Sequence, residues 1–239
     1  MNVIITGASK GIGKAIAAAF AAECANLFLC ARNEVALYNT VAELQTRYPA
    51  ATVKAKPADV SKKQAVLAFG EWAQKEAKLS GSGRVDILVN NAGLFTPGSI
   101  YNEADGLLEN LIATNLYSAY HLTRYLVAGM IEARQGHIFN ICSIASLNAY
   151  KNGGSYSISK YALLGFSKNL REELKSHGIK VTAVSTGAVM SDSWGDFDNS
   201  SNRIMEASDI ATMIVASAKL SPQAVVEDIV MRPLLGDLP

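Results

Sequence analysis

Short apolar runs alternate with longer helical segments along the whole chain. Seven runs have the length and composition of strands, at 3–6, 26–31, 52–56, 85–90, 137–142, 180–185 and 225–231. Helical patterns lie at 13–23, 34–47, 62–77, much of 103–133, and 155–176. The third of these begins with "SKKQ", which predicts a capping box of Ser61 and Gln64. Apolar strands separated by helices indicate an α/β, doubly wound fold: a parallel sheet with helices on both faces and ligands at the carboxyl ends of its strands.

Composition and charge narrow the class of protein. Residues 1–239 contain no internal repeat and no long linker, so we expect one domain. Hydrophobic residues make up 49%, which favours a sizeable core. A net charge of +1 without a long basic run argues against a nucleic-acid binder, and the apolar stretches are too short to cross a bilayer. The first residues enter a strand without a secretory pattern, so we expect a cytoplasmic protein.

The cysteines and histidines give no metal-binding pattern. Cys24, Cys30 and Cys142 are odd in number and form no CxxC, so we expect reduced thiols in the core. The three histidines are far apart and lack the spacing of a zinc site. The sequence therefore predicts no bound metal.

A glycine-rich segment, "TGASKGIG", joins the first predicted strand to the first predicted helix. Gly7, Gly11 and Gly13 would let the backbone turn tightly and approach a pyrophosphate at the helix N-terminus. A simple glycine turn is the alternative, but the position between strand and helix favours a nucleotide-binding loop.

Tyr156 and Lys160 stand four residues apart in a predicted helix and therefore share one of its faces. Alone, this pair is equally well explained as ordinary helix surface. Ser143 lies thirteen residues before Tyr156, directly after the fifth predicted strand, and Asn115 lies twenty-eight residues before Ser143. Three further hydroxyls compete with Ser143 for a role, namely Ser146, Ser155 and Ser157.

The glycine loop, "NNAG" at 90–93 and these four residues together resemble the short-chain dehydrogenase/reductase superfamily over nearly the whole chain. The resemblance implies a Rossmann-type sheet of seven strands in the order 3-2-1-4-5-6-7, with Asn115, Ser143, Tyr156 and Lys160 as the catalytic tetrad. A carbonyl substrate would receive a hydride from the cofactor and a proton from Tyr156.

Each tetrad member has an expected role. The ammonium of Lys160 would lower the pKa of Tyr156 and hold the nicotinamide ribose. Ser143 would polarise the substrate oxygen. Asn115 would break its helix locally and hold a water that connects Lys160 to solvent.

The resemblance also implies a nicotinamide dinucleotide, and the charges favour NADP over NAD. The second strand ends at Ala31, where an acid would repel a 2′-phosphate, and Arg32 and Lys10 lie nearby, although Glu34 could neutralise Arg32. Asp59 would accept a bond from the adenine amine, or else serve the local turn and helix start. The expected cofactor contacts are Gly7, Ser9, Lys10, Gly11, Ile12, Gly13, Arg32, Asp59, Val60, Asn90, Ala92, Gly93, Tyr156, Lys160, Gly187, Val189 and Ser191.

One position departs from the family pattern. Thr186 precedes Gly187, where relatives usually carry proline. Without the fixed φ of proline the turn is less pre-set, so cofactor affinity or loop order becomes the least secure part of the site.

The substrate region is expected in a polar stretch at about 191–208, which would form a mobile lid. Sepiapterin-reductase-like and 3-oxoacyl-carrier-protein-reductase-like members look most similar, so the substrate is a small carbonyl compound that a carrier protein could deliver. Arg124, Arg134 and Lys151 could receive such a carrier, or could be ordinary solvated charges. The expected substrate contacts are Leu94, Phe95, Leu147, Tyr150, Trp194 and Phe197.

Two rival functions are less consistent with the sequence. A catalytically silent NADP-binding regulator should lack part of the tetrad, and an epimerase or dehydratase should carry more than the about 50 residues that follow Met190.

By analogy with relatives, helices at 115–133 and 156–176 would pair in a homodimer or homotetramer.

Overall fold

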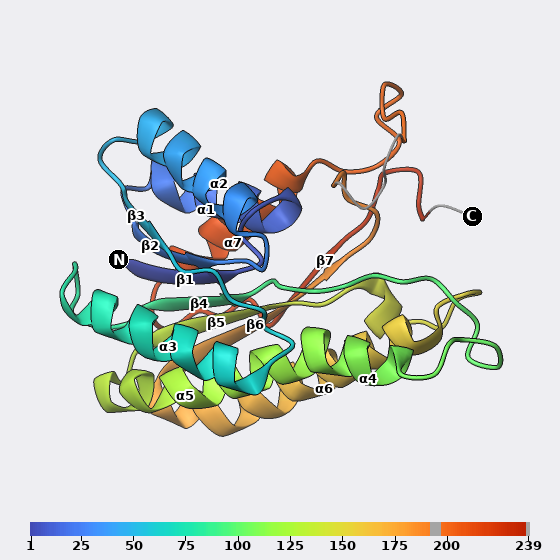
Figure 1. Ribbon diagram of the computed structural model, residues 1–239. Helices are drawn as coiled ribbons and strands as arrows, with labels where there is room; N and C mark the ends of the chain where they lie inside the picture. Colours follow the sequence, from blue (N-terminus) through green and yellow to red (C-terminus); the bar gives the residue numbers. More distant parts are fainter. Residues whose placement is uncertain (192–196, 238–239) are drawn as a thin grey trace.

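The computed structural model describes residues 1–191 and 197–237, and it contains a parallel sheet of seven strands. Their order is β3-β2-β1-β4-β5-β6-β7, so the expected doubly wound topology is confirmed (Figure 1). Between the first and second halves of the sheet the chain crosses from β3 back to β4 beside β1, which creates the crevice where such folds bind ligands. The strands are β1 (Asn2–Thr6), β2 (Asn26–Cys30), β3 (Thr52–Ala55), β4 (Ile87–Asn90), β5 (Gly136–Ile141), β6 (Ile179–Thr186) and β7 (Asp228–Met231).

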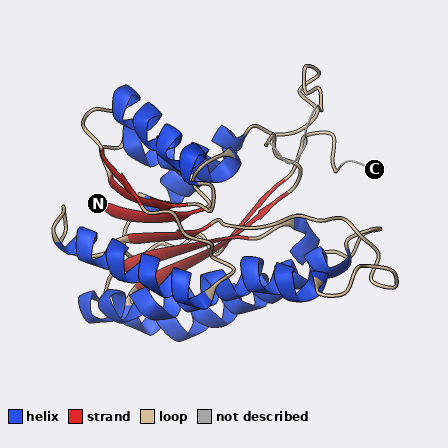
Figure 2. Cartoon of the chain, in the orientation of Figure 1, coloured by secondary structure: helices blue, strands red, loops and turns tan. Residues whose placement is uncertain are grey.

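Helices cover both faces of this sheet (Figures 1 and 2). One face carries α1 (Gly11–Ala22), α2 (Glu34–Arg47) and α7 (Ala207–Ala218). The other carries α3 (Lys63–Lys78), α4 (Leu107–Ile112), α5 (Ser118–Ala133) and α6 (Gly154–Leu174). The described residues also form the short helical turns η1 (Ala113–Tyr117), η2 (Ile144–Ser146) and η3 (Lys175–His177). The sequence pattern did not predict α7.

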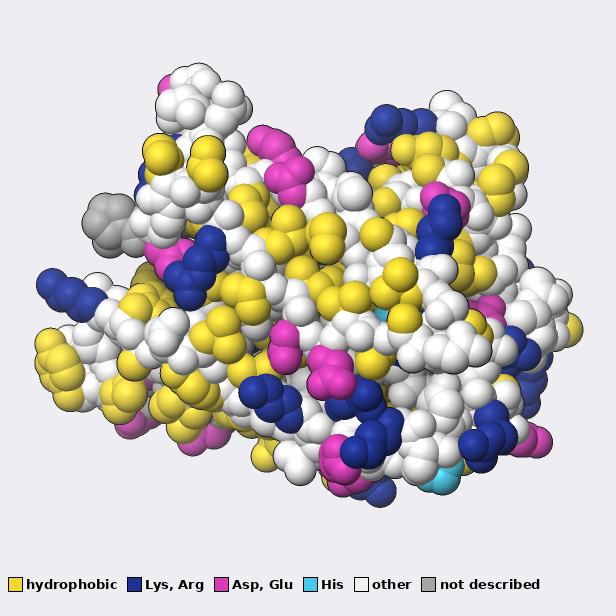
Figure 3. All heavy atoms as spheres, turned by 180° about the vertical axis from the view of Figure 1, so that it is seen from behind, with side chains coloured by type: hydrophobic (Ala, Val, Ile, Leu, Met, Phe, Trp, Pro, Cys, Tyr) yellow, Lys and Arg dark blue, Asp and Glu magenta, His cyan; other side chains and the backbone are white. Residues whose placement is uncertain are grey.

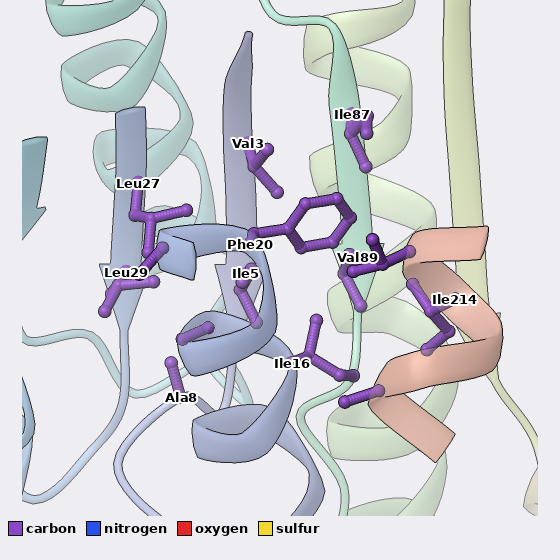
Figure 4. Close-up of a cluster of buried hydrophobic side chains, with 14 of the residues drawn as sticks. Val3, Ile5, Ala8, Ile16, Phe20, Leu27, Leu29, Ile87, Val89 and Ile214 are labelled. Carbon is purple, nitrogen blue, oxygen red and sulfur yellow. The ribbon is translucent and has the colours of Figure 1, made fainter. Parts of the chain in front are cut away.

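Strand β1 shows why the runs are apolar throughout. Val3 and Ile5 point to one side, where they pack with Phe20 of α1 and Ile214 of α7 (Figure 4). Ile4 points to the other side and belongs to a second cluster under α3 and α5. Because successive side chains of a strand face opposite ways, a strand covered by helices on both sides is apolar at consecutive positions rather than at alternate ones.

The start of α3 differs from the predicted capping box. The helix begins at Lys63, and its N-cap, Lys62, makes no side-chain capping bond. The Ser61 hydroxyl instead donates to Asp59 Oδ1 at 2.7 Å, and the Ser61 N–H donates to the same oxygen at 3.1 Å. The box of Ser61 and Gln64 is therefore wrong, because the carboxylate two residues upstream is the better local acceptor.

Helical structure fills much of 103–133, as expected, and runs from Leu107 to Ala133; Gly106 precedes it with a φ of +84°. The expectation for the cysteines is corrected in part. Cys24 is exposed at a positive φ of 56°, so it is not a core thiol, whereas Cys30 and Cys142 are buried. Burial raises the pKa of Cys30 to about 12 and that of Cys142 to about 11, so both are held as inert thiols.

The lengths of the helices and the grouping of potential ligand side chains bear on membranes and metals. None of the helices in this part of the chain is both long and apolar enough to span a bilayer. Across the same residues, no group of three or more His, Cys, Asp or Glu side chains comes together in a way that could hold a metal ion.

Candidate active site

The glycine loop after β1 has a conformation that requires its glycines. Gly7 and Gly11 have φ of +66° and +52°, where side chains with a Cβ are strained. At Gly13 an added Cβ would overlap the Gly7 carbonyl oxygen and the Asn91 side chain. Helix α1 starts at Gly11, and its N-cap, Lys10, supplies no side-chain capping bond. The loop thus presents the N-terminus of a helix, which can bind an anion such as a pyrophosphate.

Asn91 holds this loop and was missed by sequence reasoning. Its side-chain amide donates to the carbonyl oxygens of Thr6 at 2.9 Å and Gly7 at 3.1 Å. In return the Thr6 hydroxyl accepts from the backbone N–H groups of Asn91 at 3.0 Å and Ala92 at 2.9 Å. The second asparagine of "NNAG" was the available signal, because it follows a strand adjacent to β1.

Asn90, by contrast, lies inside the sheet. Its side-chain amide donates to Asn140 Oδ1 at 2.8 Å and to Thr123 Oγ1 at 3.1 Å, and the residue is buried. These bonds connect β4 with β5 and α5. Asn90 was expected to contact the cofactor, but its side chain bonds to neighbouring elements and the residue is not part of the cleft wall.

A cleft of about 560 Å³ lies at the carboxyl ends of the strands. Its volume is within the range of small-molecule and cofactor sites. Of the expected cofactor contacts, only Asn90, Gly187 and Val189 are outside its lining. The cleft brings together Gly7, Ser9, Lys10, Gly11, Ile12, Gly13, Arg32, Asp59, Val60, Ala92, Gly93, Tyr156, Lys160 and Ser191.

At one end of the cleft Arg32 lies near Asp59. The hydrogen bond from the Ser61 side chain lowers the pKa of Asp59, and the charge of Arg32 contributes further. The alternative role of Asp59 in the local turn is therefore present, while its side chain still lines the cleft. Within the described residues, the recorded ion pairs do not include one between Arg32 and Glu34.

Lys160 and Tyr156 project from the same face of α6. Lys160 is buried, and its ammonium donates to the Ile141 carbonyl oxygen at 2.8 Å, 5.9 Å from the centre of the Tyr156 ring. Burial lowers the pKa of Lys160 to about 8. Burial also raises the pKa of Tyr156, and a hydrogen bond with Ser143 opposes that effect. The expected lowering by Lys160 is thus not present here, because the ammonium engages a strand carbonyl beside the ring rather than the hydroxyl.

Ser143 follows β5 and is held by its own turn. Its Oγ accepts from the Ala145 N–H at 3.1 Å, and its N–H donates to Ser146 Oγ at 3.1 Å, which forms a capping box for η2. The competing serines are committed elsewhere: Ser146 to this box, Ser157 to the Ala145 carbonyl at 2.7 Å, and Ser155 to Glu103. Of these four serines, Ser143 lines the cavity next to the cleft, whereas the linings of that cavity and of the cleft do not include the other three.

Asn115 lies in η1, a π-helical turn, so the predicted local break in its helix is confirmed. Its carboxamide clamps Leu94, accepting from the N–H at 2.7 Å and donating to the carbonyl at 3.0 Å, and also donates to Ser159 Oγ at 2.9 Å. A Cβ at Gly93 would lie 3.3 Å from Asn115 Oδ1 and 3.5 Å from Lys160 Nζ. The glycine therefore permits the close approach of both side chains. The expected water relay stays a prediction.

A second cavity of about 460 Å³ adjoins the cleft, and Tyr156 lines both. Its wall includes Ser143, Tyr150, Gly187 and Val189. The charged side chains of its described lining are Arg232 and Asp237, which form an ion pair with each other.

The turn at Thr186 is held by sheet pairing rather than by a proline. Thr186 is the last residue of β6 and lies in register with Met231 of β7. The Gly187 N–H then donates to the Met231 carbonyl at 2.8 Å. These contacts with β7 therefore hold the backbone at Thr186 and Gly187 without a proline.

Some of the expected substrate contacts line the cavities, others lie outside them, and one is not among the described residues. Phe95 lines both cavities, Tyr150 lines the second cavity, and Leu94 lines the cleft. Leu147 packs against a cluster of Cys142 and residues of α5 and α6, and the wall of neither cavity includes it. Phe197 also lies outside both linings, and Trp194 is outside the described residues.

The described part of the predicted lid is anchored at its far end. Val189 and Met205 form a parallel bridge, with Met190 N–H donating to the Met205 carbonyl at 2.8 Å. The guanidinium of Arg203 donates to the carbonyl oxygens of Gly236 and Asp237, each at 2.9 Å. This segment is thus fastened both to the loop after β6 and to the C-terminal turn.

Comparison with known proteins gives consistent matches. A family model described as short chain dehydrogenase matches residues 1–201. A sepiapterin reductase from Chlorobaculum tepidum is 31% identical over 99% of this chain and 97% of its own. A Streptomyces violaceoruber protein assigned as ketoacyl reductase 1 of the granaticin polyketide synthase is 38% identical over 78% of this chain and 66% of its own. The crystal structure of a metagenomic short-chain oxidoreductase in complex with NADP has a TM-score of 0.83 and 31% identity, over 97% of this chain and 96% of that one.

Proposed function

The chain belongs to the short-chain dehydrogenase family, and from that premise we propose that it uses NADPH to reduce a ketone or other carbonyl group to an alcohol. The observation that carries the proposal is the position of Tyr156. Its phenol lies where a cleft of cofactor size meets a second cavity, and Ser143 lines that second cavity beside it. A hydroxyl at this junction can reach a group bound in the second cavity while a cofactor occupies the first.

The residues of the cleft fit a nicotinamide dinucleotide. The turn at Gly7, Gly11 and Gly13 leaves room that side chains would fill, next to a helix N-terminus suited to a pyrophosphate. When bound, the dinucleotide supplies the hydride. Lys160 is mostly cationic at pH 7, since its pKa is about 8, and we assign it to the ribose hydroxyls.

Preference for NADP is supported by charge. The end of β2 carries buried Ala31 where an acid would oppose a 2′-phosphate, and Arg32 follows it in the cleft wall. Arg32→Ala should raise the Kd of NADPH about tenfold, the size of one charged contact, and change that of NADH about twofold or less. Fluorescence titration of both nucleotides measures this, and an equal effect on the two would remove Arg32 from the phosphate site.

Tyr156 is assigned as the proton donor. Burial keeps its pKa above the ordinary value, so the phenol is protonated at neutral pH and has a proton to give to the carbonyl oxygen. Ser143 shares a hydrogen bond with the phenol and would orient the same oxygen. Asn115 acts on the site through Leu94, whose backbone it clamps in the cleft wall.

The substrate is proposed to be a mostly apolar carbonyl compound. The second cavity is lined largely by Ile144, Ala145, Ala149 and other uncharged residues, with the Arg232–Asp237 pair as its charged feature. The similar proteins named sepiapterin reductase and ketoacyl reductase suggest two candidates: a pteridine with a side-chain ketone, and a 3-oxoacyl thioester.

Delivery by a carrier protein has less support. Arg124 donates to Tyr120 Oη at 2.8 Å, and Arg134 donates to the Ser176 carbonyl at 3.0 Å, so both are engaged within the chain. On the face seen in Figure 3, basic and acidic side chains are interspersed. Free small-molecule substrates are therefore the first to test.

A catalytically silent NADP-binding regulator is the second candidate function, and the complete tetrad speaks against it. Purified protein should be mixed with NADPH and a panel of ketones, diketones, pteridines and 3-oxoacyl thioesters, while absorbance at the NADPH band is followed. Oxidation with at least one carbonyl is expected. Tight NADPH binding without oxidation across the panel would favour the regulator.

Assembly and location remain proposals. Apolar side chains are exposed on the α4–η1 segment and on α6, among them Leu108, Tyr117, Ile158 and Tyr161. Such a surface favours a homodimer or homotetramer through these helices. Light scattering after size-exclusion chromatography should give a mass of two or four chains, and a monomer at micromolar concentration would contradict this. A cytoplasmic location is likewise a prediction from the sequence.

A further inference from the structure

Helix α6 carries Tyr156 in its first turn, yet its own sequence provides no side-chain cap. The N-cap is Gly153 and the first helical residue is Gly154, and Gly153 makes no side-chain capping bond. The backbone N–H groups at the start of a helix need partners from elsewhere. At α6 one of these partners comes from the segment between β4 and α4.

Glu103 supplies that cap from 52 residues upstream. Its Oε1 accepts from the Ser155 N–H at 2.9 Å, and its Oε2 accepts a short hydrogen bond from the Ser155 hydroxyl. A carboxylate at a helix N-terminus also interacts favourably with the helix dipole. Ser155 immediately precedes Tyr156, so the cap acts one residue from the phenol.

Gly154, directly before Ser155, makes room for this contact. A Cβ at Gly154 would overlap Glu103 Oε1 and lie 2.5 Å from the Gly98 carbonyl oxygen, and Gly154 has a φ of +41°. Side chains at this position would push the carboxylate away from the helix. The glycine at 154 thus leaves the space that the Glu103 carboxylate occupies.

Further bonds fasten the same loop to the residues just before α6. The Gly98 N–H donates to the Asn152 carbonyl at 3.0 Å, and the Ser99 hydroxyl donates to Asn152 Oδ1 at 2.9 Å. The Glu103 N–H in turn donates to the Ser99 carbonyl at 3.1 Å. Several hydrogen bonds therefore join the loop from 94 to 103 to the start of α6, and the charged group among them is the Glu103 carboxylate.

Phe95, near the start of this loop, touches Tyr156 directly. The two rings meet edge to face with centres 4.8 Å apart, and Phe95 lines both the cofactor cleft and the second cavity. Phe95 is also 51% exposed, so packing alone holds it weakly and the loop must be positioned by other contacts.

We propose that Glu103 is a positioning residue for the reduction: its carboxylate clamps the 94–103 loop to the N-terminus of α6 and so holds Phe95 against the phenol of Tyr156. The inference rests on the proposed function, since its kinetic consequence requires carbonyl reduction. Its structural half, the clamp at Ser155, can be measured without any substrate.

The experiment compares Glu103→Ala, Glu103→Gln and the control Glu109→Ala, which alters an exposed carboxylate on α4. Glutamine can accept from the Ser155 N–H and donate to its hydroxyl, whereas alanine can do neither. Hydrogen–deuterium exchange of peptides over 94–106 and 150–160 should be faster in Glu103→Ala only. Unchanged exchange in that variant would overturn the clamp.

Kinetics test the positioning role. Glu103→Ala should lower kcat for the carbonyl substrate about 10- to 100-fold, because small displacements of reacting groups cost rates of that order. Glu103→Gln should recover most of that loss, and the Kd of NADPH should stay within about threefold, since Glu103 is not in the cleft wall. A fall in melting temperature with unchanged kcat would show a merely structural cap and overturn the proposal.

Phe95→Ala combined with Glu103→Ala tests the route of the effect. If Glu103 acts by holding Phe95, the double variant should lose no more activity than the more damaging single one; multiplied losses would refute this route. Should the parent protein reduce no carbonyl at all while the exchange differences appear, the proposed function fails but the clamp stands, so the two failures can be told apart.

Discussion

Replacing the phenol of Tyr156 with a phenyl ring is the most direct test of the proposed chemistry. Tyr156→Phe removes one hydroxyl and keeps the ring that packs edge to face with Phe95. The hydroxyl lies at the junction of the two cavities and shares a hydrogen bond with Ser143, so its loss removes the proton donor with little change in packing.

The expected magnitude follows from general acid catalysis. Proton transfer by a positioned side chain contributes about 10²- to 10⁴-fold, which corresponds to roughly 3–5 kcal/mol of barrier. We expect kcat/KM for carbonyl reduction to fall by that factor. The Kd of NADPH should change about threefold or less, since the ring remains in the cleft wall.

The assay follows NADPH oxidation at saturating cofactor, with nucleotide binding and melting temperature measured on the same samples. Tyr161→Phe is the matched control, because Tyr161 lies on the same helix with its side chain 43% exposed. The control should retain the parent rate. A Tyr156→Phe enzyme within about threefold of the parent would refute the role of the phenol, and with it the roles assigned to Ser143 and Lys160.

Three further outcomes are expected. Since the pKa of Lys160 is about 8, kcat/KM should decline as pH rises through 8, and a flat profile to pH 10 would show that its positive charge is not needed. Gly13→Ala should abolish measurable NADPH binding because its Cβ meets the glycine loop, whereas Gly165→Ala, with open space around it, should bind normally; equal binding by the two would contradict the close approach. Burial lowers the pKa of His137 to about 3, against about 6.5 in the unfolded chain. As the pH decreases, the unfolded state therefore takes up a proton first, and the free energy of unfolding decreases. Because of this residue, the free energy of unfolding measured with urea should decrease by about 2 kcal/mol between pH 6.5 and 5. His137→Leu should remove that part of the pH dependence. An unaltered pH dependence in the variant would exclude His137 as its source.

The positions of the strands and of the glycine loop could be predicted because they depend on short-range pattern, whereas the order of the strands in the sheet was expected only from the family resemblance. Val3, Ile4 and Ile5 are apolar on both faces, and only a strand covered on both sides requires that. Gly7 and Gly11 occupy φ values that other residues adopt with strain, so their spacing identifies the turn before any fold is known. Tyr156 and Lys160 share a face because the period of a helix places them there.

The same short-range reasoning failed wherever a distant or competing partner decided the outcome. Ser61 bonds to Asp59 rather than capping α3 with Gln64, because the Asp59 carboxylate accepts from the Ser61 N–H that the Gln64 side chain would need in a capping box. Asn90 and Asn91 are adjacent, but the alternation of a strand turns one into the sheet and the next toward the glycine loop. The pKa of Tyr156 depends on burial and on where Lys160 points, and neither can be deduced from spacing.

The sequence by itself determined the elements other than α7, their α/β alternation and the glycine turn, since these follow from local backbone preferences and hydrophobic period. The tetrad could be named from the sequence only through the family resemblance. Tertiary structure alone decided how the site is held: Asn115 on Leu94, Lys160 on Ile141, and Glu103 on Ser155, pairs separated by 21, 19 and 52 residues. Hydrogen bonds over such separations depend on which segments the folded core brings together, and desolvation depends on everything packed around a group. Neither these long-range hydrogen bonds nor the desolvation of a group can be deduced from the identity of a single residue or from its neighbours in the sequence.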